Sequence, residues 1–329
     1  PESAREIVER EGLEFAPFPH PGDDRLGPIW ARGQDLPREW ANFLFVSDIF
    51  AGLNASAALP GLRDEVSSWR PDLVVRESGE FAALIAAAAA GIPVAHVAVN
   101  NDLAEEWVFD HVRAKLDVLR ASIGLDPDDG ASMRASRVYT SFPKSLAASE
   151  SVARARNPFR VKTPRFAPAA GSDAPGWAVN DDRPLVYISL GTLPGGASKG
   201  LDIYCAAVEA AAALKARVLL STGGAEIEPG ALGALPDTLT VEHWVDPSDI
   251  YPRADALLCH GGSGTVLEAL AAGVPMVLTP LHADQPDNAA LVEKAGAGVM
   301  LDQPTPSTIA DALTRTLDDP DLRARAGEI

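Results

Sequence analysis

The residues with the clearest chemical potential lie between Asp255 and Gln285, where a glycine-rich loop follows a short apolar run. The run from 256 to 259 is almost continuously apolar, as expected for a parallel strand buried on both faces. His260 follows, and the next glycines let the backbone turn sharply and bring its N–H groups close to a ligand. The apolar spacing from Thr265 predicts a helix, whose first turn offers unpaired N–H donors. This pattern predicts a site that holds a phosphate without a lysine.

Polar residues around the glycines separate this loop from an ordinary chain reversal. A glycine turn between a strand and a helix often does no more than reverse the chain, and the turn alone leaves that alternative open. No lysine follows the last glycine, as a Walker A loop requires, and the glycine spacing differs from the dinucleotide-binding fingerprint. The polar residues that favour a ligand site are His260, Ser263, Thr265, Glu268, Asp284 and Gln285.

The stretch from 243 to 289 reads HWVDPSDIYPRADALLCHGGSGTVLEALAAGVPMVLTPLHADQPDNA, and it resembles the donor-binding signature of family-1 glycosyltransferases. It is most similar to the bacterial branch that decorates macrolides, enediynes and other natural products. The resemblance is close over the second half of the chain and loose over the first half. It implies the GT-B fold, an α/β fold in which two Rossmann-like, doubly wound domains face a cleft.

The resemblance also implies a reaction and its substrates. Such an enzyme moves a sugar or deoxysugar from a TDP- or UDP-sugar to a hydroxyl of an apolar polyketide-like or aromatic acceptor. Inversion at the anomeric carbon is expected, with no metal and no cofactor, since the helix dipole and His260 replace a divalent cation. Two alternatives on the same fold stay open, a catalytically silent partner protein and a nucleotide-sugar 2-epimerase. A homodimer also stays open.

The family's pattern assigns roles to individual residues of the second half. The residues expected to bind the donor diphosphate are Thr192, His260, Gly261, Gly262, Ser263, Gly264 and Thr265. Those expected to bind the nucleoside are Trp244, Val245 and Glu268, and those expected to bind the sugar are Asp284 and Gln285. The residues alone leave other interpretations, a helix-surface carboxylate for Glu268 and a helix N-cap region for Asp284 and Gln285.

The first half offers fewer candidates. Glu77 lies at the carboxyl end of a predicted strand, where open parallel sheets bind ligands, and it is the best match for the acid that orients the family's catalytic histidine. A solvated loop charge, or a pair with Arg76, fits Glu77 equally well. The aromatic residues at 40–50 and 107–109 fit either a core or the wall of an acceptor pocket. His111 fits a packed or surface histidine better than a catalytic one.

In the family, the general-base histidine stands on a loop after the first strand of the fold. The chain opens directly on a helical pattern at 2–10, so we expect that strand, its loop and its helix to precede Pro1. A closing helix is likewise expected after Ile329. Without the histidine, transfer by this chain should be slow, about 10²- to 10⁴-fold below that of a chain extended at its amino end.

Length and composition limit the class of protein. A chain of 329 residues gives about two domains, and a net charge of −18 argues against nucleic acid as a partner. No apolar run reaches the length of a membrane span and no signal peptide is evident, so a cytoplasmic protein is expected. Cys205 and Cys259 lie in apolar segments, where packed thiols are expected, and no residues have zinc-site spacing.

The elements of the first half follow from the hydrophobic pattern. Helices are expected over 2–10, 36–59, 62–69, 81–90 and 100–120. Strands are expected over 13–18, 72–75, 92–99 and 138–142, the last of them closing the first sheet, and a long loop is expected over 20–37.

The second half is more regular. Helices alternate with six strands, expected over 185–190, 217–222, 239–243, 256–259, 276–279 and 299–301. This alternation predicts a doubly wound parallel sheet. We therefore expect an acceptor-binding domain over 1–165, a linker over 166–180 and a nucleotide-sugar-binding domain over 181–329.

Overall fold

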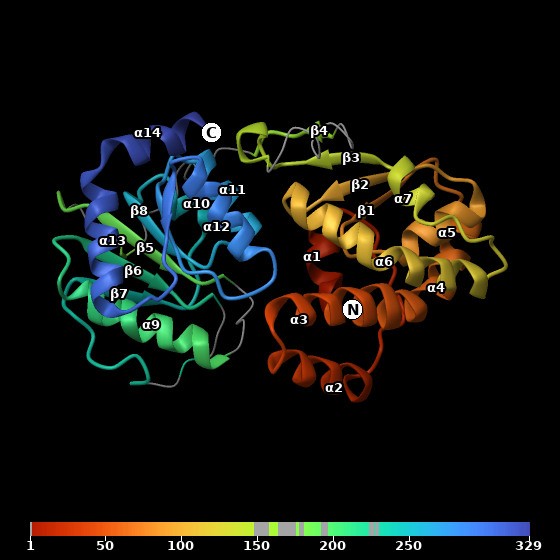
Figure 1. Ribbon diagram of the computed structural model, residues 1–329, viewed down its shortest axis with the longest axis horizontal. Helices are drawn as coiled ribbons and strands as arrows, with labels where there is room; N and C mark the ends of the chain where they lie inside the picture. Colours follow the sequence, from red (N-terminus) through yellow and green to blue (C-terminus); the bar gives the residue numbers. More distant parts are fainter. Residues whose placement is uncertain are drawn as a thin grey trace. The chain divides into compact units, whose positions relative to one another are not determined.

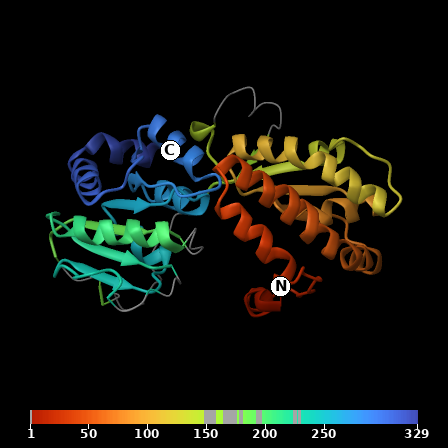
Figure 2. The same ribbon diagram turned by 60° about the horizontal axis from the view of Figure 1, so that its bottom comes forward.

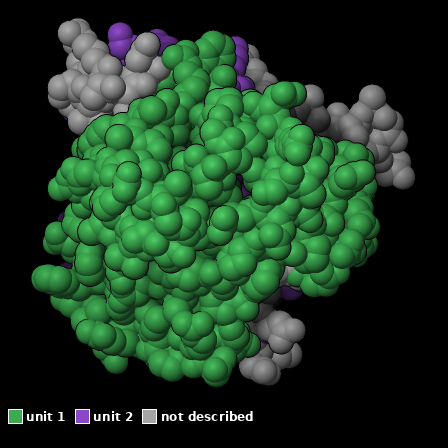
Figure 3. Space-filling view, turned by 90° about the vertical axis from the view of Figure 1, so that its right-hand side faces the viewer, with its two compact units in different colours: residues 1–140, 149–160 green, residues 141–148, 161–329 purple. Residues whose placement is uncertain are grey.

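The computed structural model describes residues 2–147, 158–163, 176–177, 181–191, 197–223, 227 and 230–329. The chain divides into two compact units, residues 1–140 with 149–160 and residues 141–148 with 161–329. Figure 1 traces the chain, and Figure 3 shows one face of the first unit in green. The boundaries and the acceptor and donor roles assigned to the domains stay predictions.

The first unit is built on a parallel sheet of four strands in the order β1-β2-β3-β4. The strands are β1 (Val74–Glu77), β2 (Val94–Ala98), β3 (Arg137–Thr140) and β4 (Phe159–Arg160). Parallel neighbours need long crossovers, which are supplied by α5 (Ala82–Ala90), α6 (Asp102–Ser122) and α7 (Ala131–Ala135). The prediction that the strand at 138–142 closes this sheet is wrong, because β4 pairs with β3.

The amino-terminal segment departs from the prediction in one place and agrees in another. Helical turns do occupy the start of the chain, as η1 (Glu2–Ala4) and α1 (Arg5–Arg10). The strand expected over 13–18 is wrong, since these residues form neither helix nor strand. Leu13 is 64% exposed, and the segment pairs with none of the strands in the described part of the chain. An apolar run without a hydrogen-bonding neighbour does not become a strand.

The long loop expected over 20–37 is also wrong, because α2 (Asp23–Gln34) occupies most of it. Asp23 and Asp24 stand in its first turn, where carboxylates interact favourably with the helix dipole. Trp30 packs its ring against Phe45 at 4.3 Å between centroids. The glycine and proline content suggested a loop, but this tertiary contact and the favourable first turn outweigh it.

One long helix follows, and it confirms the helix predicted over 36–59. It comprises α3 (Arg38–Leu44), the π-helical stretch η2 (Phe45–Asn54) and α4 (Ala55–Trp69), in red and orange in Figure 2. By length and hydropathy, the span Arg38–Trp69 is apolar enough to cross a membrane, a test that core helices of soluble proteins also pass. Ala51, Ala55 and Leu59 are buried and pack in one cluster with α5. This packing buries one face of the helix, about a third of its most apolar window.

The aromatic residues of this region divide between core and surface. Phe50 packs against the core of the unit, whereas Trp40 is 63% exposed. His111 stacks on Trp107 at 4.2 Å between ring centroids, and its Nδ1 lies 2.7 Å from the Trp107 carbonyl oxygen. Phe43 meets the same imidazole edge-on at 5.7 Å. His111 is therefore a packed histidine, as the sequence favours.

The second unit is built on a six-stranded parallel sheet in the order β10-β9-β8-β5-β6-β7, as predicted. The strands are β5 (Leu185–Ser189), β6 (Arg217–Ser221), β7 (Leu239–Glu242), β8 (Ala256–Cys259), β9 (Met276–Leu278) and β10 (Gly298–Met300). The helices are α9 (Ala197–Ala211), α10 (Pro247–Ile250), α11 (Ser263–Ala271), α12 (Gln285–Lys294), α13 (Pro306–Asp318) and α14 (Pro320–Glu328). Strand order reverses between β8 and β5, the switch point at which open parallel sheets form a ligand crevice.

Alternate residues of the central strands feed two separate cores. In β5, Leu185 and Tyr187 join the cluster beneath α10, α11, α12 and α14, whereas Val186 and Ile188 join the cluster beneath α9 and α13. All residues of β5 and β8 are buried, as continuous apolar strands require. Cys259 is a buried free thiol, in agreement with the expectation of packing.

A buried polar cluster joins three elements of the first unit. Ser78 follows β1, His96 lies in β2 and Glu105 in α6, and each is at most 3% exposed. The Ser78 hydroxyl donates to Glu105 and lies 3.2 Å from His96 Nε2, which in turn lies 3.3 Å from Glu105 Oε2. The cluster fixes the amino-terminal half of α6 to the carboxyl edge of the sheet.

We expect Glu105→Ala to lower the free energy of unfolding of the first unit by about 3–5 kcal/mol, because it removes a carboxylate from a buried polar cluster. The matched control is Glu106→Ala on the same helix, whose partner Arg134 is 41% exposed at its side chain. That change should cost at most about 1 kcal/mol. Urea titration measures both, and equal losses would contradict a special role for the cluster.

Candidate functional site

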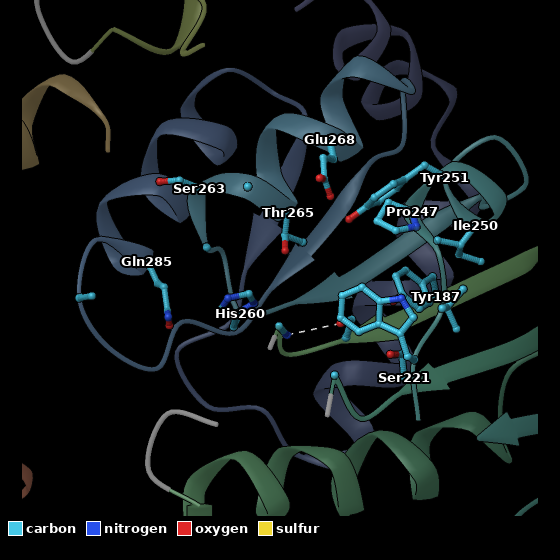
Figure 4. Close-up of a pocket in the computed structure, with 18 of the residues that line it drawn as sticks. Tyr187, Ser221, Pro247, Ile250, Tyr251, His260, Ser263, Thr265, Glu268 and Gln285 are labelled. Carbon is cyan, nitrogen blue, oxygen red and sulfur yellow. Dashed lines mark hydrogen bonds between the residues drawn. The ribbon is translucent and has the colours of Figure 1, made fainter. Parts of the chain in front are cut away.

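A pocket of about 440 Å³ lies at the switch point of the second unit, and all its lining residues belong to that unit. Figure 4 shows most of these side chains. The lining brings together ten of the residues predicted from the sequence: Trp244, Val245, His260, Gly262, Ser263, Gly264, Thr265, Glu268, Asp284 and Gln285. Residues from five separate loops and helices therefore meet where one ligand can touch them all.

His260 lies at the carboxyl end of β8, and its imidazole packs in space between Gly191 and Gly262. A Cβ added to Gly191 would lie 2.7 Å from His260 Cε1, and one added to Gly262 would lie 2.4 Å from Nε2. Gly191 also adopts φ 83°, which disfavours any other residue. The pairing of β5 with β8, with Ser189 opposite Cys259, brings these positions together. The imidazole is thus held in a slot that only glycines leave open.

Burial controls the charge of His260. Desolvation and, to a smaller degree, the proximity of His282 lower the pKa of the imidazole to about 4, while Asp284 acts in the opposite direction. Within the described part of the chain, the buried Nδ1 has no hydrogen-bond partner. The ring is therefore neutral near pH 7, and it can serve a ligand as an N–H donor. Of the two roles that the sequence offers His260, an N–H donor and a share of the charge neutralisation, a neutral ring favours the donor.

The first turn of α11 supplies backbone donors. Gly262 is its N-cap in an extended conformation and offers no side-chain oxygen, so the N–H groups of Ser263, Gly264 and Thr265 stay available to a ligand. Gly261 does not line the pocket but shapes the turn at φ 81°, and a Cβ there would lie 3.1 Å from the Gln285 carbonyl oxygen. This arrangement has the geometry that an anion site at a helix N-terminus needs, and the diphosphate role of these residues stays a prediction.

Glu268 and Tyr251 point toward one another at another part of the pocket (Figure 4). Burial raises the pKa of the Glu268 carboxyl group, and a hydrogen bond with Tyr251 lowers it. Trp244 lines the same pocket and is 57% exposed, whereas Val245 is 6% exposed. The carboxylate therefore faces the pocket rather than an open helix surface, and an exposed indole lines the same pocket.

Asp284 ties the loop after β9 to the start of α11. Its Oδ2 accepts from the Ser263 hydroxyl at 2.5 Å and from Asn288 Nδ2 at 2.8 Å. Asn288 Nδ2 also lies 2.9 Å from the Gly261 carbonyl oxygen. Asp284 occupies the N-cap position of α12, yet its side chain makes no capping hydrogen bond there. Its carboxylate is therefore committed to the pocket wall.

One predicted residue, Glu77, lies outside this assembly. Glu77 ends β1 in the first unit, where its Oε2 accepts from the Gly79 N–H at 2.8 Å, and its orienting role stays a prediction. Arg76 Nη1 donates to the Glu77 carbonyl oxygen at 2.9 Å. Thr192 lies outside the residues that the structure describes.

Several lining residues escaped sequence analysis: Tyr187, Ser189, Ser221, Tyr251 and His282. Ser189 and Ser221 could have been found, because each is a polar residue at the carboxyl end of an apolar strand. The other residues gave no such signal. Among the described residues, no group of three or more potential ligands forms a metal site.

Comparison with known proteins gives relatives for both units. Residues 207–329 match the family described as erythromycin biosynthesis protein CIII-like, C-terminal domain, and residues 33–121 match the corresponding N-terminal domain. The elloramycin glycosyltransferase of Streptomyces olivaceus is 30% identical over 278 residues, 84% of this chain and 68% of that protein. The L-demethylnoviosyl transferase of Streptomyces niveus is 32% identical over 254 residues, 75% of this chain and 62% of that protein. The chain thus spans about two thirds of the length of these relatives.

A solved structure gives the fold. The spinosyn rhamnosyltransferase complexed with thymidine diphosphate is 21% identical, with a TM-score of 0.72 over 100% of this chain and 85% of that chain. At this identity the likeness shows the fold alone. Further glycosyltransferases of solved structure share it, so the predicted α/β class and GT-B fold are confirmed.

We expect acid to destabilise the second unit through His260. The unfolded chain binds a proton near pH 6.5 and the folded chain only near 4, so stability is full above this range and is lost as pH falls through it. The loss relative to His260→Asn, which cannot titrate, should reach about 3 kcal/mol. Urea titrations of both proteins across this range measure it, and parallel pH profiles would contradict the burial of a neutral imidazole.

A second prediction tests the glycine slot. The extended backbone of Gly262 accepts alanine, but the added Cβ must displace the imidazole. In Gly262→Ala, the pKa of His260, followed by NMR without ligand, should rise from about 4 toward its ordinary 6.5. Gly264→Ala is the control, because a Cβ there meets nothing within 4 Å. An unchanged pKa in Gly262→Ala would show that the ring does not depend on the slot.

Proposed function

The chain belongs to the erythromycin biosynthesis protein CIII-like family of natural-product glycosyltransferases, and we propose that its second unit binds the donor, a nucleoside diphosphate sugar. The enzyme then transfers the sugar to a hydroxyl of an apolar natural-product acceptor in the cytoplasm. Because the chain spans about two thirds of its relatives, the activity proposed belongs to the whole enzyme. The observation that carries the proposal is the single pocket that unites the anion site with Glu268 and Asp284.

The order of side chains along the pocket matches the parts of such a donor. In Figure 4, Tyr251 and Pro247 lie toward one side, His260 and Thr265 in the middle, and Gln285 toward the other side. We assign the first region to the nucleoside, where Trp244 can stack on a base and Glu268 can accept from a sugar hydroxyl. The middle region, at the first turn of α11, fits the diphosphate.

The same donors serve the chemical step. Negative charge grows on the diphosphate as the glycosidic bond breaks, and preorganised N–H groups stabilise that charge without reorganisation. The first turn of α11 and the imidazole of His260 provide such groups in a partly buried site. The proposal therefore includes neither a metal ion nor a cofactor.

We propose thymidine as the nucleoside. Two glycosyltransferases of similar fold, the spinosyn rhamnosyltransferase and the glycosyltransferase VinC, were solved in complex with thymidine diphosphate. Uracil differs from thymine by one methyl group, for which a pocket discriminates by only about 1–3 kcal/mol, so a UDP-sugar is the next candidate. The deoxyribose of thymidine leaves only its 3′-hydroxyl for Glu268.

Glu268 gives the proposed function a direct test. Wild-type protein should bind TDP about 10-fold more tightly than 3′-deoxy-TDP, because a carboxylate accepts a strong hydrogen bond from the 3′-hydroxyl. Glu268→Gln should lose most of this preference, whereas Glu209→Gln, on the exposed face of α9, should keep it. Isothermal titration calorimetry at about pH 8, above the ordinary carboxyl range, measures the affinities. Absence of TDP and UDP binding by the wild type would refute the proposal.

A further inference from the structure

The side-chain amide of Gln285 is oriented by its own loop. Its Oε1 accepts hydrogen bonds from two backbone N–H groups, those of Leu281 at 2.9 Å and His282 at 3.0 Å. Both partners can only donate, so the atom that faces them must be the oxygen of the amide and not its nitrogen. Gln285 is 4% exposed, which leaves the amide little freedom to turn.

The orientation of the amide determines the tautomer of His282. The amide nitrogen of Gln285 lies 3.3 Å from Nδ1 of His282. Because an amide NH₂ group only donates, Nδ1 must accept, and the proton of the neutral imidazole then sits on Nε2. Burial lowers the pKa of His282, with Asp284 acting in the opposite direction, which favours the neutral ring. His282 is thus set as a donor through Nε2–H.

The backbone of this loop is held in a strained conformation. Ala283 adopts φ 52°, a left-handed conformation that residues other than glycine rarely take. Both residues adjacent to Ala283 in the chain are held by hydrogen bonds. His282 bonds to Gln285, and Asp284 bonds to Ser263 and Asn288. Strain of this kind persists where the surroundings over-determine it, and it often marks a ligand site. The turn sends His282 and Asp284 to the same pocket.

We propose that His282 donates a hydrogen bond from Nε2 to a hydroxyl of the transferred sugar, and that Gln285 is a positioning residue that acts through His282. The assignment rests on the proposed function, since it concerns the sugar end of the same donor. It also replaces the direct contact between Gln285 and the sugar that the sequence implies. His282 fits this end because it is bonded to Gln285, which lies across His260 from Tyr251 in Figure 4.

A double-mutant cycle tests the coupling, with TDP and TDP-glucose as calorimetric probes. His282→Ala and Gln285→Leu should each weaken TDP-glucose about 3- to 12-fold, the value of one hydrogen bond, and leave TDP within about 2-fold. The double variant should bind TDP-glucose no more weakly than His282→Ala. The matched controls are His20→Ala and Gln303→Leu, two exposed positions outside the pocket, and both should bind as the wild type does.

The outcomes separate this inference from the proposed function. Multiplied losses in the double variant would overturn it, because Gln285 would then contact the sugar by itself. An equal loss of TDP and TDP-glucose in His282→Ala would also overturn it and place the imidazole on the diphosphate. Wild-type protein that binds neither probe would refute the proposed donor, which is a different failure.

Gln285→Glu provides a readout that a merely structural role would not move. The carboxylate still accepts from the two backbone N–H groups, but it now requires a proton on His282 Nδ1, so a neutral ring presents a bare Nε2 to the sugar. Protonation restores the Nε2–H donor. Affinity for TDP-glucose in this variant should therefore rise as pH falls, at least about 3-fold relative to wild type. The same dependence in both proteins would overturn the tautomer argument.

Two controls complete the pH experiment. His260 and Asp284 are the titratable groups that act electrostatically on His282, and both are unchanged by the substitution, so the ratio of variant to wild type reports on His282 together with the introduced carboxyl group. Nitrogen-15 NMR of the imidazole reads the tautomer directly. Wild-type His282 should show Nε2–H and Gln285→Glu should show Nδ1–H, and Nδ1–H in the wild type would overturn the inference.

Discussion

The parallel pairing of β5 with β8 is the constraint on which the pocket at the switch point of the second unit depends. These strands adjoin at the point where strand order reverses, and their register sets Ser189 opposite Cys259. The loops that follow them must therefore diverge from adjacent positions, and the slot between Gly191 and Gly262 receives the His260 imidazole. A register shifted by one residue would turn alternate side chains to the opposite face and remove the histidine from the switch point. The buried strands thus fix a contact that neither loop could fix alone.

The proposed site would hold an anion with dipoles and N–H groups, and this solution suits an acidic protein. A net charge of −18 gives an unfavourable distant field, but salt screens it over about 10 Å, whereas the donors of α11 act at contact. A neutral His260 fits this scheme, because it brings an N–H without the desolvation cost of a buried cation. On this proposal, the positions of the N–H groups in the pocket, and not the net charge of the protein, decide what the site binds.

Much of the second unit could be predicted from its sequence, because buried parallel strands, glycine turns and strand-end polar residues leave strong local patterns. The amino-terminal segment could not. Residues 13–18 pair with no strand in the described part of the chain, and α2 forms despite Pro28, with Trp30 packed against Phe45. His282 was missed for a related reason. Its chemistry depends on a hydrogen bond with Gln285 that folds back within one loop, and no periodicity records such a bond.

A buried histidine and a partly buried one show why residue types alone do not identify a site. Ser78, His96 and Glu105 have the composition of a nucleophilic triad, but a working triad uses the two ring nitrogens separately, one toward the serine and one toward the acid. Here the contacts to Ser78 and to Glu105 both involve Nε2 of His96, and the serine donates directly to the carboxylate. Burial closes the cluster to solvent. His260 is the opposite case, since its slot opens on a pocket whose other walls carry donors and carboxylates. Access and the assignment of each ring nitrogen distinguish a structural histidine from a binding one.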